Sequence, residues 1–208
     1  RWKMARRDYP NEYPSVTTIL GVLRKIALEN WFKVNTAQFC NEESARGRKI
    51  GTQIHEAIQS YIETGVSKID TEYPDEVTNA LNSFMLFRRE CPEIKLHKSE
   101  LPLTSEVYKF NGTIDCIAEG MLVDWKTGNA KESDKPKIYD EHKYQVASYV
   151  HLYNEVQKTN IDKAIIVVIA KDKVSYDTYR MEKEEIDGCF NEVFLPALKI
   201  INYQRSQK

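Results

Sequence analysis

An uninterrupted apolar run constrains the fold of this chain more than any other feature. Residues 163–170, KAIIVVIA, are rich in Ile and Val and too few for a typical helix. Such a run is typical of a strand buried on both faces, which requires a sheet covered by helices on each side. We therefore expect an α/β fold with a central mixed β-sheet flanked by helices.

Helical periodicity predicts a mainly helical part over residues 15–92. Two short helices follow the capping residue Ser15, an amphipathic helix spans 44–63 and ends at Gly65, and a fourth runs from 74 or 75 to 89. The apolar residues of the two short helices, which we expect in the core, are Ile19, Leu20, Leu23, Leu28, Trp31 and Phe32.

Strand signals dominate the remainder, residues 93–208. Alternation predicts three strands at 94–103, 107–119 and 121–127, with a turn at Asn111 and Gly112. A helix over 140–156, strands over 163–170 and 174–180, and a last helix over 183–203 complete the order. We expect one domain over 1–208, preceded by a basic lead-in at 1–14 that we interpret as a solvated arm.

The composition indicates a protein with one hydrophobic core and without a strongly basic surface. The 208 residues are 41% hydrophobic, which suffices for one core, and the net charge of −1 excludes a grip on nucleic acid by bulk electrostatics. We expect a soluble, intracellular protein, because no apolar run reaches about 20 residues and no signal-peptide pattern is visible. It would be cytoplasmic, or phage-encoded in a host cytoplasm, and a mitochondrial location stays open. The first residue is Arg1 rather than Met, so we expect further residues upstream.

The four cysteines form no CxxC or CxxH pattern, which argues against a disulfide framework or a zinc finger. We expect buried thiols at these positions, which are Cys40, Cys91, Cys116 and Cys189.

The stretch LVDWKTG at 122–128 carries the chemistry. Alternate side chains of a strand share a face, so Asp124 and Lys126 point the same way while Trp125 fills the core and leaves its backbone carbonyl between them. Asp115, on the preceding strand, can lie beside Asp124 through hairpin pairing. Two carboxylates and a carbonyl are hard oxygen ligands that suit Mg²⁺ or Mn²⁺. The same spacing also fits an ordinary solvated face.

Four motifs follow one another in a recognisable order: GTQIHEAI, GTID, VDWKTG and QVASY. Together they resemble the PD-(D/E)XK nuclease superfamily, in particular its RecB-like branch. The opening YPSVTTIL at 13–20 is similar to that of phage exonucleases and of the mitochondrial genome maintenance exonuclease. The resemblance covers residues 51 to 149. It implies a restriction-endonuclease-like core with a helical N-terminal part, and a nuclease that acts on DNA with one or two Mg²⁺ or Mn²⁺ ions.

The resemblance also implies residue roles. His55, Asp115, Asp124 and the Trp125 carbonyl match metal ligands, and Lys126 matches the catalytic lysine that acts with Asp124 and Asp115. Gln145 and Tyr149 match a pair that positions the substrate, and they lie on one side of a helix. Glu100 matches a supporting acidic position. Some relatives hold an iron–sulphur cluster, which we do not expect because Cys189 is the single cysteine beyond the core.

More ordinary interpretations remain for single residues. A lone histidine beside an apolar stripe, such as His55, is more often a hydrogen-bonded core residue than a ligand. Gln145 and Tyr149 also fit ordinary surface and core positions. The ordered series favours the functional interpretation, since all four ordinary explanations would have to coincide.

A stripe of small residues precedes His55. Gly47, Gly51 and His55 are spaced four apart and share one helix face, although glycine inside a helix costs about 1 kcal/mol relative to alanine. One hypothesis is that a DNA strand runs over this stripe, flanked by Arg46, Arg48 and Lys49. The other is that a neighbouring element packs closely on the glycines.

Three functions remain in view. The first is an exonuclease at DNA ends, with single-stranded DNA as one candidate substrate, in recombination, repair or replication. The second is a structure-specific endonuclease. The third is a nucleic-acid-binding module that has lost activity, against which the complete set of His55, Asp115, Asp124 and Lys126 argues.

Overall fold

A five-stranded sheet in the order β1-β2-β3-β4-β5 forms the centre of the structure, a computed structural model that describes residues 12–66, 73–130 and 134–207. The strands are β1 (Leu96–Ser105), β2 (Phe110–Ala118), β3 (Met121–Gly128), β4 (Ala164–Ala170) and β5 (Tyr176–Met181). Neighbouring strands are antiparallel except β3 and β4, which are parallel. The predicted mixed sheet is confirmed.

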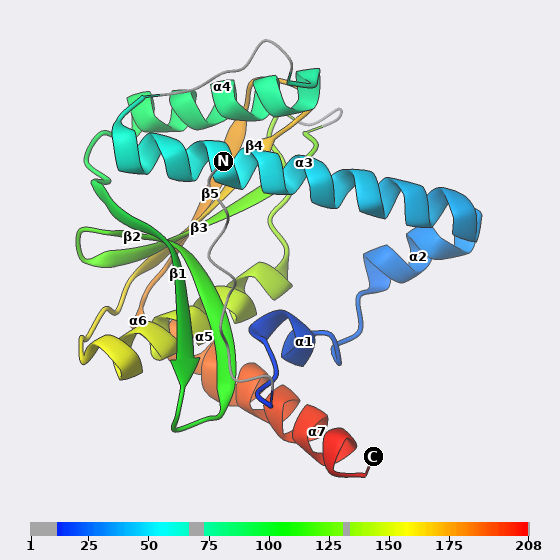
Figure 1. Ribbon diagram of the computed structural model, residues 1–208, viewed down its shortest axis with the longest axis vertical. Helices are drawn as coiled ribbons and strands as arrows, with labels where there is room; N and C mark the ends of the chain where they lie inside the picture. Colours follow the sequence, from blue (N-terminus) through cyan, green and yellow to red (C-terminus); the bar gives the residue numbers. More distant parts are fainter. Residues whose placement is uncertain (1–11, 67–72, 131–133, 208) are drawn as a thin grey trace.

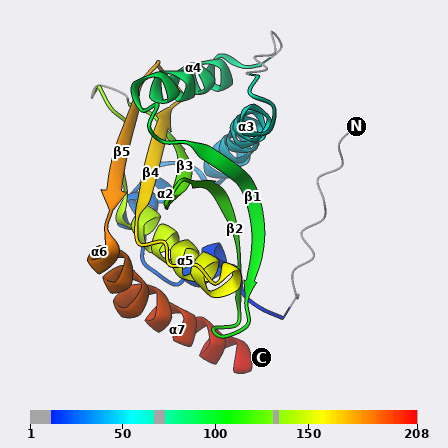
Figure 2. The same ribbon diagram turned by 90° about the vertical axis from the view of Figure 1, so that its left-hand side faces the viewer.

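Helices cover both faces of this sheet (Figures 1 and 2). On one face lie α3 (Ala37–Thr64) and α4 (Asp75–Glu90), and on the other lie α1 (Val16–Leu20), α5 (Asp140–Gln157), α6 (Lys183–Gly188) and α7 (Leu195–Ser206). Two hydrophobic cores result, one around Trp125 and Phe84 and one around Phe110 and Phe194. All seven residues of β4 are buried between these cores, as the run KAIIVVIA predicted.

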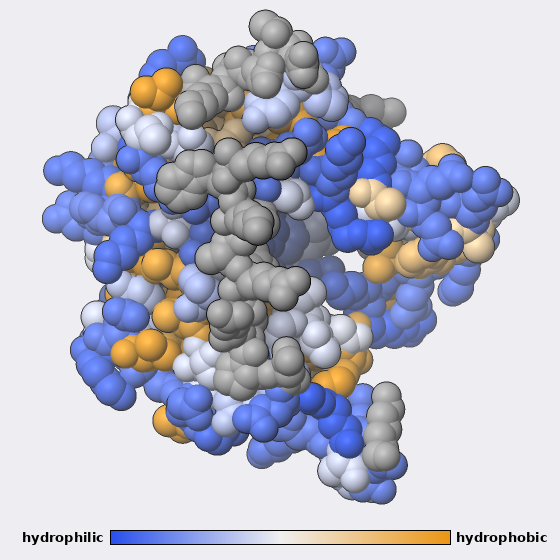
Figure 3. Space-filling view, viewed as in Figure 1, coloured by the Kyte–Doolittle hydropathy of each residue, from blue (hydrophilic) through white to orange (hydrophobic). Residues whose placement is uncertain are grey.

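The second short helix, α2 (Ile26–Val34), does not join the core, so the prediction that Leu28 and Phe32 are buried is wrong. Leu28 is 44% and Phe32 47% exposed, because α2 and the start of α3 project from the body of the protein (Figures 1 and 3). The ring of Trp31 packs locally on Phe32 and Phe39. Ile19 and Leu20 of α1 are buried as predicted.

The predicted turn at Asn111 and Gly112 is also wrong, because both residues lie within β2 and the chain turns at 106–109. Glu155 of α5 holds this turn by accepting hydrogen bonds from the N–H groups of Glu106 and Val107. Gly112 serves close packing instead of a turn: a Cβ atom there would lie 2.8 Å from the ring of Tyr149.

Two helices differ in extent from the prediction. α3 begins at Ala37, with the Thr36 side chain as its cap, rather than at residue 44, and it ends as predicted at Gly65 in the left-handed region (φ +72°). The predicted helix 183–203 is continuous, but a π-helical segment, η1 (Cys189–Phe194), lies between α6 and α7. None of the helices in the described ranges is long and apolar enough to cross a membrane. The basic residues of the lead-in predicted at 1–14 lie outside the described part of the chain.

Candidate active site

β2 and β3 separate at the positions of two predicted acidic residues. The strands pair through Cys116 with Val123, Ile117 with Leu122, and Ala118 with Met121. At the next position a side chain replaces the backbone ladder: Asp115 Oδ2 accepts a hydrogen bond of 2.9 Å from the Trp125 N–H. β3 continues alongside β4 as far as Gly128. We call this opening, bounded by Asp115 on β2 and Asp124 to Lys126 on β3, the strand fork.

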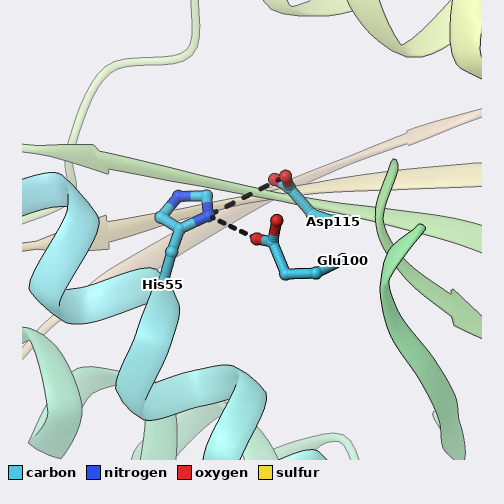
Figure 4. A group of neighbouring side chains, drawn as sticks. All are labelled: His55, Glu100 and Asp115. Carbon is cyan, nitrogen blue, oxygen red and sulfur yellow. Dashed lines mark ion pairs between the residues drawn. The ribbon is translucent and has the colours of Figure 1, made fainter. Parts of the chain in front are cut away.

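A cluster of three possible metal ligands lies at the fork (Figure 4). His55 Nδ1 lies 3.7 Å from Glu100 Oε1 and 3.8 Å from Asp115 Oδ1. One ligand atom from each residue falls within 4.8 Å of the others. α3 supplies His55 because its apolar stripe, including Ile54 and Ile58, is buried against the sheet and orients the helix.

Glu100 reaches the cluster from β1. Its neighbours Ser99 and Leu101 pair with Cys116 and Ile114, so Glu100 stands opposite Asp115. Its backbone has φ +50°, in the left-handed region, which costs a residue with a side chain about 1 kcal/mol. Such local strain is more common at functional sites than elsewhere. The sequence had indicated Glu100 only as a supporting residue, whereas the structure places it beside His55 and Asp115.

The charges around His55 favour its protonated form in the metal-free protein. Burial by itself lowers the pKa of the imidazole, but hydrogen bonding to Glu100 and the nearby charge of Asp115 outweigh burial and raise the pKa. A cation that binds the cluster would replace this proton as the partner of the two carboxylates.

Asp124 and Lys126 form a buried ion pair next to the cluster. Lys126 Nζ lies 2.6 Å from Asp124 Oδ2, and the Asp124 side chain is 0% exposed. Burial raises the pKa of Asp124 to about 7, against the lowering influence of Lys126. Burial also lowers the pKa of Lys126, but Asp124 and Asp115 outweigh it, so the pKa is raised and the amine stays protonated. As the alternation predicted, Trp125 lies in the opposite core, against Phe84 and Phe87.

The donor set fits a divalent cation. His55, Asp115 and Glu100 offer one nitrogen and two carboxylates, the mixture that Mn²⁺ and Mg²⁺ sites use. Asp124 Oδ2 is paired with Lys126, whereas Asp124 Oδ1 is buried without a hydrogen bond to any described residue, which is costly unless a second cation is near. The N–H and C=O of one strand residue point to the same side, so the Trp125 carbonyl faces the fork as its N–H does.

A cavity of about 460 Å³ opens in front of the cluster, lined by residues that include His55, Asp115 and Glu100. Arg48 and Gly51 of α3 line it too. A Cβ atom at Gly51 or Gly47 would have no other described part of the chain within 4 Å, apart from its own helix, so close packing does not explain these glycines.

The other two basic residues predicted beside the glycines do not line the cavity. Arg46 forms ion pairs with Glu43 and with Glu76 of α4, and thereby links α3 to α4. The side chain of Lys49 is exposed.

Gln145 and Tyr149 are joined by a 2.8 Å hydrogen bond from Gln145 Nε2 to the Tyr149 hydroxyl. Tyr149 lines the cavity of His55, whereas Gln145 lines a second, smaller cavity together with Lys126. The pair therefore lies between the two cavities. α1 lies here as well, because Asn111 of β2 holds the preceding segment through bonds to the carbonyls of Tyr13 and Pro14.

Comparison with solved structures supports the fold. A candidate exonuclease from Eubacterium rectale is similar over 100% of this chain and 89% of its own, with a TM-score of 0.63 and 14% sequence identity. An alkaline exonuclease from Laribacter hongkongensis covers 94% of each chain at 12% identity, but its TM-score of 0.42 is too low to support an argument. Searches with protein-family models and among curated proteins find no match. At these identities the likeness to the first structure shows a shared fold.

Proposed function

We propose that this protein is a metal-dependent DNA nuclease of the RecB-like PD-(D/E)XK type, and that it hydrolyses phosphodiester bonds at DNA ends. The observation that carries this proposal is the strand fork, where the cluster of His55, Glu100 and Asp115 adjoins the buried pair of Asp124 and Lys126. The order of the four motifs and the fold shared with a candidate exonuclease support it.

His55 and Asp115 of the cluster, with the adjoining Asp124 and the Trp125 carbonyl, would hold one Mg²⁺ or Mn²⁺ ion. Glu100, the third member of the cluster, is close enough to contribute to the same ion or to a second one. When bound, such an ion activates water and offsets charge on the phosphate. Because an imidazole is a softer ligand than a carboxylate, we expect Mn²⁺ to support activity better than Mg²⁺.

Lys126 stabilises the negative charge that develops on the scissile phosphate. Its raised pKa keeps the ammonium group protonated, which suits an electrostatic role better than that of a general base. Asp124 fixes the position of this ammonium group at 2.6 Å. Gln145 and Tyr149 position the DNA strand, since their hydrogen-bonded pair lies between the two cavities.

The DNA strand approaches along α3. Gly51 and Arg48 line the cavity in front of the cluster, where a bare helix surface leaves room for a sugar–phosphate backbone and Arg48 supplies a positive charge. A free or single-stranded end fits this path, because one strand must reach a site that lies between α1, α3 and β2. Recombination, repair and replication are the processes that generate such ends.

The test is a time course with end-labelled linear DNA and covalently closed circular DNA, each single- and double-stranded, in Mn²⁺, in Mg²⁺ and in EDTA. We expect short products from linear DNA in Mn²⁺ and none in EDTA. Cleavage of circular DNA would mean that the protein is an endonuclease instead of an exonuclease. Absence of cleavage in every metal, with DNA binding retained, would leave an inactive binding module and overturn the proposal.

A further inference from the structure

A second cavity lies on the side of Lys126 that holds Gln145. It has a volume of about 220 Å³ and is lined by residues that include Lys25, Lys126, Glu141 and His142. The two lysines come from different parts of the chain: Lys126 lies on β3, and Lys25 immediately precedes α2. The proposed mechanism uses Lys126 and Gln145 but gives no task to His142.

The position of His142 in α5 fixes which ring nitrogen carries a proton. His142 is the third residue of the helix, and its Nδ1 accepts a hydrogen bond of 3.4 Å from the N–H of Tyr139, the residue before the helix. In a neutral imidazole one nitrogen accepts and the other donates. Nδ1 is the acceptor, so the proton is on Nε2, which is left to donate.

The ring is neutral at physiological pH. Burial, and then the nearby charges of Lys126 and Lys25, lower the pKa of His142 to about 4. The cavity therefore combines two cations with one neutral N–H donor whose tautomer is fixed. This combination suits an anion with several acceptor oxygens, because the lysines supply charge and the imidazole supplies direction without adding a third positive charge.

We propose that His142 is a phosphate-binding residue of this enzyme, donating Nε2–H to an oxygen of a nucleic-acid phosphate that occupies the second cavity next to Lys126. The inference rests on the proposed nuclease function and deepens it, since it gives the substrate two phosphate contacts on opposite sides of the Gln145 and Tyr149 pair. Glu141 is the opposing charge in the cavity, and it limits how tightly a phosphate is held.

Two substitutions separate this role from helix capping. Gln and Glu at the third position of a helix both accept from the N–H of the capping residue, so His142→Gln and His142→Glu should each preserve α5. Only Gln also offers an N–H donor to the cavity. If His142 had only a structural role, the Glu variant should be as stable as the Gln variant or more stable, because the glutamate would pair with Lys25 and Lys126. The two variants should then also bind DNA with equal affinity.

The experiment measures binding of a fluorescein-labelled single-stranded oligodeoxynucleotide in EDTA by anisotropy, together with kcat and KM in Mn²⁺ and thermal unfolding. We expect His142→Gln to retain affinity within about threefold, and His142→Glu to weaken it by about tenfold or more with an unchanged Tm. Equal affinity and kcat/KM for the two variants would overturn the inference while leaving the nuclease function intact.

Glu141→Gln provides a control with the opposite sign. It removes a negative charge from the same cavity without touching the imidazole, so it should tighten oligonucleotide binding severalfold. Unchanged affinity would mean that no phosphate enters the cavity, which overturns the inference. If the wild-type protein neither binds nor cleaves DNA, the proposed function itself fails, and this inference fails with it.

Discussion

The ammonium group of Lys126 lies 2.6 Å from the carboxylate of Asp124, in a site where the Asp124 side chain is completely buried. Removing one partner of such a pair leaves an uncompensated charge, which typically costs about 3–5 kcal/mol. Stability and the proposed catalysis therefore depend on the same two groups, and substitutions can separate them.

We predict that Lys126→Met abolishes measurable cleavage and destabilises the protein in a pH-dependent way. Asp124 already has a raised pKa, and loss of Lys126 raises it further. A group with a folded pKa above its unfolded value binds more protons when folded, so the free energy of unfolding should fall as the pH rises from 5 to 8. Urea unfolding at several pH values measures this.

The double variant Asp124→Asn with Lys126→Met is the matched control. It carries no buried charge at this position, so it should regain most of the stability at pH 8 while cleavage stays absent. Recovery of activity in the double variant, or no recovery of stability, would contradict the buried-pair explanation.

We predict that His55→Ala weakens Mn²⁺ binding at least about tenfold while changing the Tm of the metal-free protein little. The side chain lies beside two carboxylates that a cation would neutralise, and it contributes little to the hydrophobic core. Calorimetric titration with Mn²⁺ measures the affinity. Glu106→Gln, at the exposed turn between β1 and β2, is the control and should leave the affinity unchanged. An unchanged dissociation constant for His55→Ala would show that His55 is not a metal ligand and would favour the ordinary interpretation of a hydrogen-bonded histidine.

We predict that Gly51→Leu preserves or slightly raises stability, because a Cβ atom there meets open space and leucine favours helix over glycine by roughly 0.5–1 kcal/mol. The same side chain should obstruct the cavity and lower DNA affinity and cleavage at least about tenfold. Gly188→Leu, at a second helical glycine with open space around its Cβ position, is the control and should bind DNA normally. If the Gly51→Leu variant unfolds, or if it binds DNA normally, the hypothesis that DNA runs over these glycines is contradicted.

We predict that His142 makes the protein sensitive to acid. Its pKa of about 4 when folded lies below the unfolded value of 6.5, so the unfolded chain binds a proton that the folded protein does not. Stability should therefore fall by about 1–3 kcal/mol as the pH falls from 6.5 to 4. His142→Gln should lose less stability over the same range, as urea unfolding at each pH would measure. Identical acid profiles for the two proteins would contradict this prediction.

The sequence predicted those features that depend on local periodicity. The run KAIIVVIA predicted the buried strand β4, and alternation in LVDWKTG predicted that Trp125 lies opposite Asp124 and Lys126. Apolar spacing also predicted a short helix with Leu28, Trp31 and Phe32 in the core. It could not indicate that this helix, α2, projects from the body of the protein and leaves Leu28 and Phe32 exposed.

The position of Glu100 could not be predicted, because the turn of its hairpin was predicted at the wrong residues. With the turn at 106–109, Glu100 stands opposite Asp115 across the hairpin. With a turn at Asn111 and Gly112, Glu100 would not lie opposite Asp115. Asn111 and Gly112 are typical turn residues, but here Gly112 admits the ring of Tyr149 and Asn111 holds the chain before α1. These tasks depend on elements that are distant in the sequence, so local turn propensity could not indicate them.

Asp115 has two separate roles at the strand fork, one in the fold and one beside His55, and natural selection would act on the two roles differently. One carboxylate oxygen satisfies the Trp125 N–H, a backbone group that would otherwise be left without a partner at the point where β2 leaves β3. The other faces His55. If the proposed catalysis were lost in a descendant protein, the charge of His55 would no longer be needed, whereas an acceptor at position 115 would still stabilise the fold by satisfying the Trp125 N–H. In such descendants we expect the aspartate at 115 to persist longer than the histidine at 55, because its contribution to the fold does not depend on the proposed activity.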